Sequence, residues 1–173
     1  NMSIGQGFVL STPLQLANAT AAIANGGTLY RPQLVREVTD GEGNLLRAFA
    51  PDVIREIPVS PNTLDIVQQG MRSAVSGAGA TAWALDVPAV AVAGKTGTAE
   101  YFIDRNKDGI PDRDREGNLP THAWFTAYAP YKNPEIVVTV FVFGGGEGSG
   151  TAVPIAGEIL NYFFSQDRET VSP

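Results

Sequence analysis

Apolar residues recur along this chain at the two spacings that secondary structure imposes. After Ser60 and Pro61, apolar residues three and four positions apart predict a helix with one buried face, and the stretch 153–164 predicts another. The apolar positions on these two faces are Leu64, Val67, Met71 and Val75 in the first helix, and Ile155, Ile159, Tyr162 and Phe163 in the second. Three further stretches predict strands, namely 89–102, 123–129 and 136–143. The last of them, IVVTVFVF, is nearly continuous in apolar residues, which predicts that both of its faces are covered.

The amino-terminal helix is predicted mainly by its ends. Thr12 and Gln15 have the spacing of a capping box, and Pro13 suits the first helical position. The helix should end near Asn25, because a pair of glycines follows and can adopt the left-handed conformation that ends helices.

The stretches 28–40 and 44–58 predict a hairpin around the turn DGEGN. Together with the other elements, the order is helix, hairpin, helix, three strands and helix. Strands that follow one another through short links form antiparallel sheets, so we expect an α+β fold with an antiparallel sheet and helices packed on it. The chain shows no internal repeat or domain boundary.

Composition narrows the range of functions. A chain of 173 residues can bury the core of one domain, and its net charge of −6, with three lysines and no basic block, argues against nucleic-acid partners. The absence of cysteine excludes disulfides and thiol catalysis, and fits an extracytoplasmic bacterial protein. No apolar run has the roughly 20 residues that span a bilayer, and NMSIGQGF does not resemble a signal peptide, so we expect the chain to be a fragment.

Gly-Lys-Thr, which begins at Gly94, is shared by two kinds of site. A phosphate-binding loop needs a glycine five positions earlier and a helix directly after the threonine. Ala89 stands at the earlier position, the intervening VAVA alternates as in a strand, and GTAEYF follows instead of a helix start. We therefore reject a nucleotide site.

Lys-Thr-Gly, in contrast, lies on a strand beside the active site of serine β-lactamases and penicillin-binding proteins. Along a strand, Lys95 and Gly97 point to one face, and Thr96 and Thr98 point to the other. Gly97 leaves room for a ligand backbone, and Lys95 supplies a cation for an anionic substrate.

The chain as a whole resembles the carboxyl-terminal half of the transpeptidase domain of class B penicillin-binding proteins, especially the elongation-type enzymes called penicillin-binding protein 2. The resemblance rests on motifs in the family's order and spacing: SIGQGFVLSTPLQLANATAAIANGG, RPQLV, AGKTGTAE, HAWFTAYAP and PIAGEILNYFF. It implies that residues 1–173 form part of a serine β-lactamase/penicillin-binding transpeptidase fold. Only the acidic segment at about 103–120 departs from the family pattern.

In that family a serine attacks the D-Ala-D-Ala end of a peptidoglycan stem peptide, a second stem resolves the acyl-enzyme into a cross-link, and β-lactams trap the same serine. The resemblance implies that Lys95 and Thr98 act in catalysis, Thr98 through its backbone N–H as an oxyanion donor. It also implies that Thr96, Gly97 and Thr98 bind substrate. No cofactor is required. The implied location is the extracytoplasmic face of the bacterial inner membrane, with an anchor outside this chain and a glycosyltransferase and the cell-elongation machinery as partners.

The nucleophile of such an enzyme is not in this chain. Ser-x-x-Lys needs a serine three positions before a lysine, and the three lysines are preceded there by Val92, Asp104 and Ala129. Ser60-Pro61-Asn62 matches Ser-x-Asn in form, but it suits a helix start better. We therefore expect the chain alone to be inactive and to need the amino-terminal half of the same domain.

Other interpretations remain open. A non-enzymatic penicillin sensor or a transpeptidase-like binding module would share this half of the fold, and the upstream sequence would distinguish them. The Gly5-Gln6-Gly7 motif and HAWFTAYAP disfavour a class D-like β-lactamase. A calcium-binding structural module would leave Lys-Thr-Gly unexplained. The single histidine, His122, is expected to be a strand-end residue because the family assigns proton transfer to lysine, and Trp83 is expected to pack or to form the cleft rim.

The segment DRNKDGIPDRDREG, which begins at Asp104, has the spacing of a calcium loop. Asp104, Asn106 and Asp108 place oxygens at alternate positions, and Asp112 occupies the ninth. The twelfth position is Arg115 and not the usual glutamate. Two interpretations are open: a structural calcium site formed by these four acidic and amide side chains, or a solvated connection whose Asp, Asn and Gly residues favour turns.

If calcium binds this segment, millimolar calcium should raise the melting temperature of the protein, because a ligand that binds only the folded state stabilises it. Asp108→Ala should abolish the increase. Thermal unfolding with calcium and with a chelator tests this, and an unchanged melting curve would rule out the calcium site.

Overall fold

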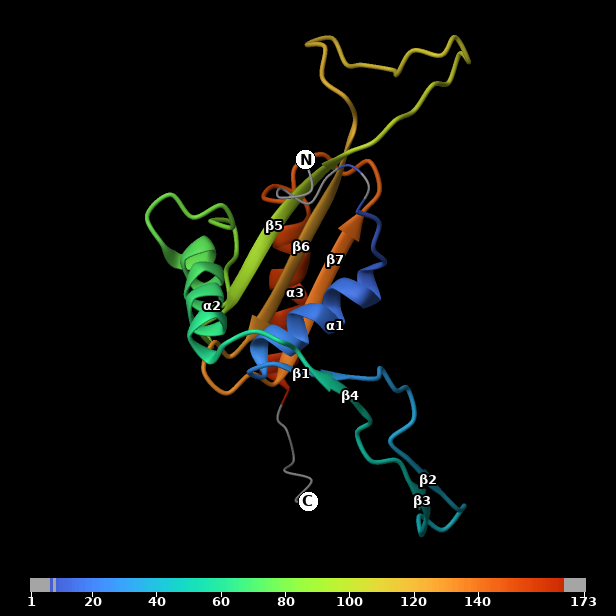
Figure 1. Ribbon diagram of the computed structural model, residues 1–173, viewed down its shortest axis with the longest axis vertical. Helices are drawn as coiled ribbons and strands as arrows, with labels where there is room; N and C mark the ends of the chain where they lie inside the picture. Colours follow the sequence, from blue (N-terminus) through green and yellow to red (C-terminus); the bar gives the residue numbers. More distant parts are fainter. Residues whose placement is uncertain (1–6, 8, 167–173) are drawn as a thin grey trace.

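The computed structural model describes residue 7 and residues 9–166 and has an α+β architecture (Figure 1). Its elements are α1 (Pro13–Ala24), β1 (Thr28–Tyr30), β2 (Glu37–Thr39), β3 (Leu45–Ala48), β4 (Val53–Glu56), α2 (Pro61–Ser76), β5 (Ala93–Glu100), β6 (Thr121–Ala129), β7 (Ile136–Val142) and α3 (Ala152–Ser165). The predicted antiparallel sheet with packed helices is confirmed, and its three strands lie in the order β5-β6-β7.

The helix starts follow the predicted capping chemistry. The Thr12 hydroxyl accepts a hydrogen bond from the Gln15 amide at 3.2 Å, and the Gln15 side chain accepts one from the Thr12 amide at 2.9 Å. At the start of α2, the Ser60 hydroxyl accepts a hydrogen bond from the Thr63 amide at 3.2 Å, and Pro61 follows in the first turn. Ser60 is therefore a helix cap, as the sequence indicated.

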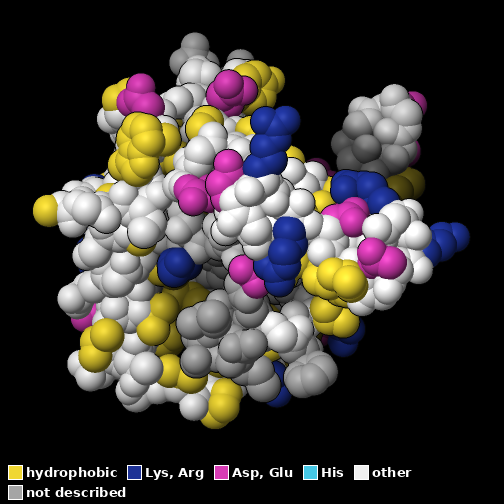
Figure 2. Space-filling model, turned by 90° about the horizontal axis from the view of Figure 1, so that it is seen from above, with side chains coloured by type: hydrophobic (Ala, Val, Ile, Leu, Met, Phe, Trp, Pro, Cys, Tyr) yellow, Lys and Arg dark blue, Asp and Glu magenta, His cyan; other side chains and the backbone are white. Residues whose placement is uncertain are grey.

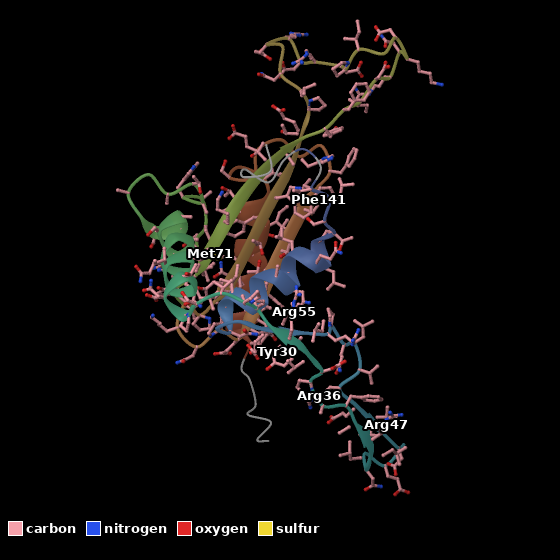
Figure 3. All side chains as sticks on the ribbon, viewed as in Figure 1. Tyr30, Arg36, Arg47, Arg55, Met71 and Phe141 are labelled. Atoms are coloured by element: carbon pink, nitrogen blue, oxygen red, sulfur yellow. The ribbon has the colours of Figure 1, made fainter. Side chains whose placement is uncertain are left out.

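The three-stranded sheet carries a helical layer on each face. On one face, α3 packs against the alanines of β6, Phe125 and the inward valines of β7. On the other face, α1 and α2 cover Ala93 and Tyr128, with Ala24 and Met71 as their contacts (Figure 3). β6 is thus buried from both sides, and it positions the two strands that flank it.

The expected cover on both faces of 136–143 is confirmed for most of β7 and is wrong at its end. Both α1 and α3 contact β7, and Val138 and Val140 are buried. Phe141 is 37% exposed, and Phe143, beyond the strand, is 70% exposed. Phe141 lies opposite Trp124, which in turn lies opposite Gly97 of the Lys-Thr-Gly strand (Figure 3).

The apolar face predicted for α3 is partly wrong, because three of its four residues are exposed. Ile155, Ile159 and Tyr162 are exposed by 39%, 42% and 70%. The buried face consists of Ala152, Val153, Ala156, Gly157 and Leu160. Val153 and Leu160 of this face are fully buried in the core, and Ile155, Ile159 and Tyr162 face away from it.

The predicted hairpin forms an arm that consists of two separate ladders (Figure 1). β1 pairs with β4, and β2 pairs with β3 farther out, each with an irregular register. Pro32 and Pro51 lie between the two ladders, where a residue without an N–H interrupts strand pairing. Arg36 and Arg47 lie on the outer part of this arm, away from the three-stranded sheet (Figure 3).

Three threonine hydroxyls connect α1 to the middle of the sheet. Thr20 donates to the Leu16 carbonyl at 2.9 Å, and its oxygen lies 2.9 Å from the Thr126 hydroxyl. Thr126 lies 2.8 Å from the Thr139 hydroxyl of the neighbouring strand. Each hydroxyl has one proton. Because the Thr20 proton is used on the helix, Thr126 donates to Thr20, and Thr139 donates to Thr126.

Thr126→Val should lower the free energy of unfolding by about 1–3 kcal/mol, because it leaves the Thr139 hydroxyl without its acceptor and Thr20 without its donor. Thr126→Ser retains the hydroxyl and should recover most of the loss. Urea unfolding of the purified variants measures both free energies of unfolding. Equal stability of the valine variant and the wild type would show that the hydroxyl chain contributes nothing.

Candidate active site

The Lys-Thr-Gly residues lie on β5, at the edge of the three-stranded sheet. The register with β6 places Lys95 opposite Thr126 and Gly97 opposite Trp124, on the face that α1 and α2 cover. The adjacent residues Thr96 and Thr98 belong to the α3 face. Lys95 and Thr98 are exposed, and Thr96 and Gly97 are half-buried.

The direction of the peptide groups of β5 follows from two hydrogen bonds. Beyond the end of the strand, the Tyr101 amide donates to the Pro120 carbonyl at 3.1 Å and so extends the pairing with β6. The Thr96 carbonyl instead accepts a hydrogen bond from the Lys95 ammonium at 2.7 Å. Successive residues of a strand direct their peptide groups to opposite edges. The N–H of Thr98, two residues after Thr96, therefore points to the outer edge, where no described strand pairs with β5.

Two hollows lie beside β5. The first has a volume of about 710 Å³, lies between α1, α2 and the loop 78–81, and has a mainly apolar lining that includes Lys95 and Thr126. The second has a volume of about 540 Å³ and is lined by Gly97, Thr98 and the aromatic residues that follow along the sheet. The structure therefore places the predicted site residues along one strand. Lys95 lines the first hollow, and Gly97 and Thr98 line the second.

Gly97 has a packing role in addition to the predicted one. A Cβ at this position would lie 3.1 Å from the Trp124 Cβ, which is tighter than most such contacts. The sequence indicated a glycine that keeps space open for a ligand backbone. The neighbouring strand requires the small residue as well, since Trp124 lies directly opposite.

His122 is held in a structural arrangement. Its Nδ1 accepts a hydrogen bond from the Gly144 amide at 3.0 Å, and its ring stacks on Tyr101 with centroids 4.0 Å apart. Burial lowers the pKa of His122 below its ordinary value, so the ring is neutral at pH 7. A second proton would place a donor against the Gly144 amide. Trp83, which was expected to pack or to form a rim, is 76% exposed, and a packing role is wrong.

The predicted calcium ligands make hydrogen bonds with the loop itself. Asp104 accepts from the Asp108 and Gly109 amides, at 3.2 and 2.8 Å. Asn106 donates to Asp108, and Asp112 forms an ion pair with Arg105 at 3.0 Å. Among the described residues, no three Asp, Glu or His side chains gather where they could hold a metal ion. The calcium site formed by Asp104, Asn106, Asp108 and Asp112 stays a prediction.

The second half of the acidic segment is a tight turn. Asp114 accepts hydrogen bonds from the Glu116 and Asn118 amides at 3.0 and 2.8 Å, and its pKa lies below the ordinary value because of the bonds from Asn118. The tip of the arm has the same arrangement between Asp40 and Asn44. These two acidic residues therefore form turns.

The sequence-based expectations did not include two residues that shape the site. Thr126 is buried opposite Lys95, and Gly148 packs against the other face of β5. The glycine-rich run GGGEGSG marks this loop in the sequence, but it does not distinguish Gly148 from its neighbours. Gly5 and Gln6 of the Gly-Gln-Gly motif lie outside the described residues, and Gly7 lines the second hollow.

Charged side chains of both signs share one face of the molecule. On the face shown in Figure 2, Lys and Arg side chains are interspersed with Asp and Glu side chains and do not form a basic patch. Within the part of the chain that the structure describes, no helix has both the length and the apolar character needed to cross a bilayer.

Comparison with known proteins identifies the family. The family model described as penicillin binding protein transpeptidase domain matches residues 1–161. The peptidoglycan D,D-transpeptidase MrdA of Haemophilus influenzae is 34% identical over 96% of this chain and 26% of its own length. The peptidoglycan D,D-transpeptidase PbpA of Mycolicibacterium smegmatis is 35% identical over 88% of this chain and 29% of its own length.

Solved structures give the same result. The imipenem acyl-enzyme complex of penicillin-binding protein A from M. tuberculosis superposes with a TM-score of 0.74 at 30% identity, over 94% of this chain and 33% of that one. PBP2 of Pseudomonas aeruginosa in complex with WCK 5153 superposes with a TM-score of 0.72 at 32% identity. The match covers 99% of this chain and 34% of that one. The chain spans about a quarter to a third of the length of these relatives. It belongs to the penicillin-binding protein transpeptidase domain family, with class B proteins of the penicillin-binding protein 2 type among its relatives.

Proposed function

We propose that this chain is one wall of the active site of a D,D-transpeptidase that cross-links peptidoglycan stem peptides through a serine acyl-enzyme. The observation that carries the proposal is the position of Lys-Thr-Gly on an edge strand whose alternate peptide groups point outward, in a chain of the transpeptidase family. β-Lactams resemble the end of the stem peptide and would occupy the same place. Relatives captured as imipenem and ceftriaxone acyl-enzymes support this.

The substrate would lie along the outer edge of β5 as an added strand. An extended peptide can hydrogen-bond to the outward N–H and C=O groups of an edge strand, which gives affinity that does not depend on the peptide's side chains. Its terminal carboxylate would lie near the Lys95 ammonium, with Thr96, Gly97 and Thr98 along the path. Lys95 is exposed and can leave the Thr96 carbonyl to meet an anion.

In the acylation step, the serine hydroxyl of the amino-terminal half attacks the carbonyl carbon between the two D-alanines. The new C–O bond places a negative charge on the carbonyl oxygen, and the N–H groups of Thr98 and of the serine would stabilise it by donating hydrogen bonds to that oxygen. Each such donor is typically worth about 3–4 kcal/mol. The intermediate collapses with cleavage of the C–N bond, and D-alanine leaves with a proton. The amine of a second stem then displaces the serine oxygen and forms the cross-link.

The apolar hollow between α1 and α2 is where the amino-terminal half of the domain would pack. An open space of about 710 Å³ with a mainly apolar lining, directly beside Lys95, suits the segment that carries the serine. Residues 1–173 would then be the carboxyl-terminal portion of the domain, and inactive alone. Because peptidoglycan lies outside the cytoplasm, the site would face the extracytoplasmic side of the inner membrane. A glycosyltransferase and the cell-elongation machinery would be its partners there.

A penicillin sensor or a transpeptidase-like binding module is the alternative. It would use the same edge of β5 to hold a stem peptide or a β-lactam, but it would not turn over substrate. The difference lies in the half of the domain that provides the nucleophile.

Fluorescent penicillin should label the full-length protein on a serine that precedes this chain, as mapped by mass spectrometry. Lys95→Ala should slow labelling by roughly a hundredfold, because positioning and charge in the cleft are lost together. Lys132→Ala removes the same charge from the turn at Tyr131 and should label as the wild type does. Residues 1–173 alone should not be labelled.

The outcomes separate the hypotheses. No covalent adduct on the full-length protein, with reversible penicillin binding retained, would favour the binding module. An adduct on a residue within 1–173 would overturn the assignment of the nucleophile. Equal effects of the two lysine variants would show that Lys95 has no special role.

His122→Asn should leave the labelling rate within about threefold of the wild type, not the roughly 10²–10⁴-fold loss expected for a general base. The asparagine side-chain oxygen can still accept the hydrogen bond from the Gly144 amide. The rate of penicillin labelling at pH 7 measures this, and a hundredfold loss in a folded variant would assign proton transfer to His122.

A further inference from the structure

The loop between β7 and α3 lies directly against the Lys-Thr-Gly strand. Gly148, in this loop, is buried. A Cβ built on it would lie 2.5 Å from the Gly97 carbonyl oxygen, 3.2 Å from the Gly97 nitrogen and closer still to the Trp124 carbonyl oxygen. The Gly148 amide also points to the Thr98 hydroxyl, at 3.4 Å. No side chain fits at position 148 unless the strands move.

The Gly97 carbonyl and the Thr98 N–H belong to the same planar peptide group. The carbonyl of that group points toward β6, and its N–H points to the outer edge of β5, where the proposed oxyanion lies. Any tilt of the carbonyl turns the N–H by the same angle. Gly148 therefore contacts one end of the peptide group whose other end is the proposed donor.

Gly148 itself is fixed on the side away from the strand. Its carbonyl accepts hydrogen bonds from the Ala152 and Val153 amides, both at 3.0 Å, in the first turn of α3. Ala152 and Val153 are fully buried in the core. Nearer β7, the Thr151 hydroxyl donates to the Gly145 carbonyl at 2.7 Å. A larger residue at position 148 would therefore press on the paired backbones of Gly97 and Trp124.

We propose that Gly148 is a positioning residue that sets the orientation of the Gly97–Thr98 peptide group for the oxyanion. It touches no substrate and acts only through that peptide. This inference rests on the proposed transpeptidase function. It explains why the connection to α3 has a glycine where a Cβ would meet the backbone of β5, and it assigns a role to a residue on the face of β5 that lies opposite the cleft.

The same loop provides a matched control. Gly150 is two residues away, and a Cβ on it would have no atom within 4 Å. Gly148→Ala and Gly150→Ala therefore add the same methyl group to the same loop, and only the first meets the strand.

The test uses the full-length protein and fluorescent penicillin over a range of concentrations, which separates the noncovalent dissociation constant from the acylation rate constant. Gly148→Ala should lower the acylation rate constant by roughly 10–100-fold, as expected for a misplaced oxyanion donor. Its dissociation constant should stay within about threefold, since uniform binding is not affected. Gly150→Ala should match the wild type in both constants.

Thr151→Val covers the case in which Gly148→Ala does not fold. It removes the hydrogen bond to the Gly145 carbonyl and loosens the loop without adding an atom beside Gly97. It should lower the acylation rate constant several-fold, and Thr151→Ser should restore it. If Gly148→Ala folds and has the wild-type acylation rate constant, the proposal is overturned. If Gly148→Ala does not fold, a wild-type acylation rate constant in Thr151→Val overturns it. A wild-type protein that forms no adduct would instead refute the transpeptidase function itself.

Discussion

The register between β5 and β6 is the constraint on which the rest of this structure depends. The pairing runs unbroken from Ala93 opposite Tyr128 to Glu100 opposite Thr121. A slip by one residue would turn every side chain of β5 to the other face and every peptide group to the other edge. Lys95 would leave the hollow beside α1, and the Thr98 N–H would point into the sheet. The chemistry of the strand is therefore fixed by backbone pairing before any side chain contributes.

Burial of β6 on both faces is what holds this register. Phe125 and the alanines of β6 pack on α3, while Tyr128 and Thr126 face α1 and α2. The Tyr128 hydroxyl is fully buried, and burial raises its pKa to about 12. A slip of β6 would carry the Thr126 hydroxyl into the apolar layer beneath α3, where it would lose Thr20 and Thr139 as partners at a cost of about 1–3 kcal/mol.

The sequence predicted what local chemistry decides. Thr12, Gln15 and Ser60 cap helices as expected, and the alternation around Lys95 gave the correct strand. Prediction from the sequence failed where contacts between distant parts of the chain decide which side chains are buried. Ile155 and Ile159 form a good apolar stripe by spacing, but α3 turns the face with Val153, Ala156 and Leu160 to the core instead. The importance of Gly148 could not be predicted either, because it arises from contact with residues about fifty positions earlier in the chain.

The acidic segment between β5 and β6 closes on itself. The Asp112 amide donates to the Ile103 carbonyl, the Asp114 amide donates to the Asn118 carbonyl, and the last link to the sheet is the bond from Tyr101 to Pro120. Because those closures lie outside the sheet, residues can be gained or lost in the segment without altering the strand pairing. A change of length in this segment would therefore alter the surface beyond the sheet and leave the register of β5 with β6 in place.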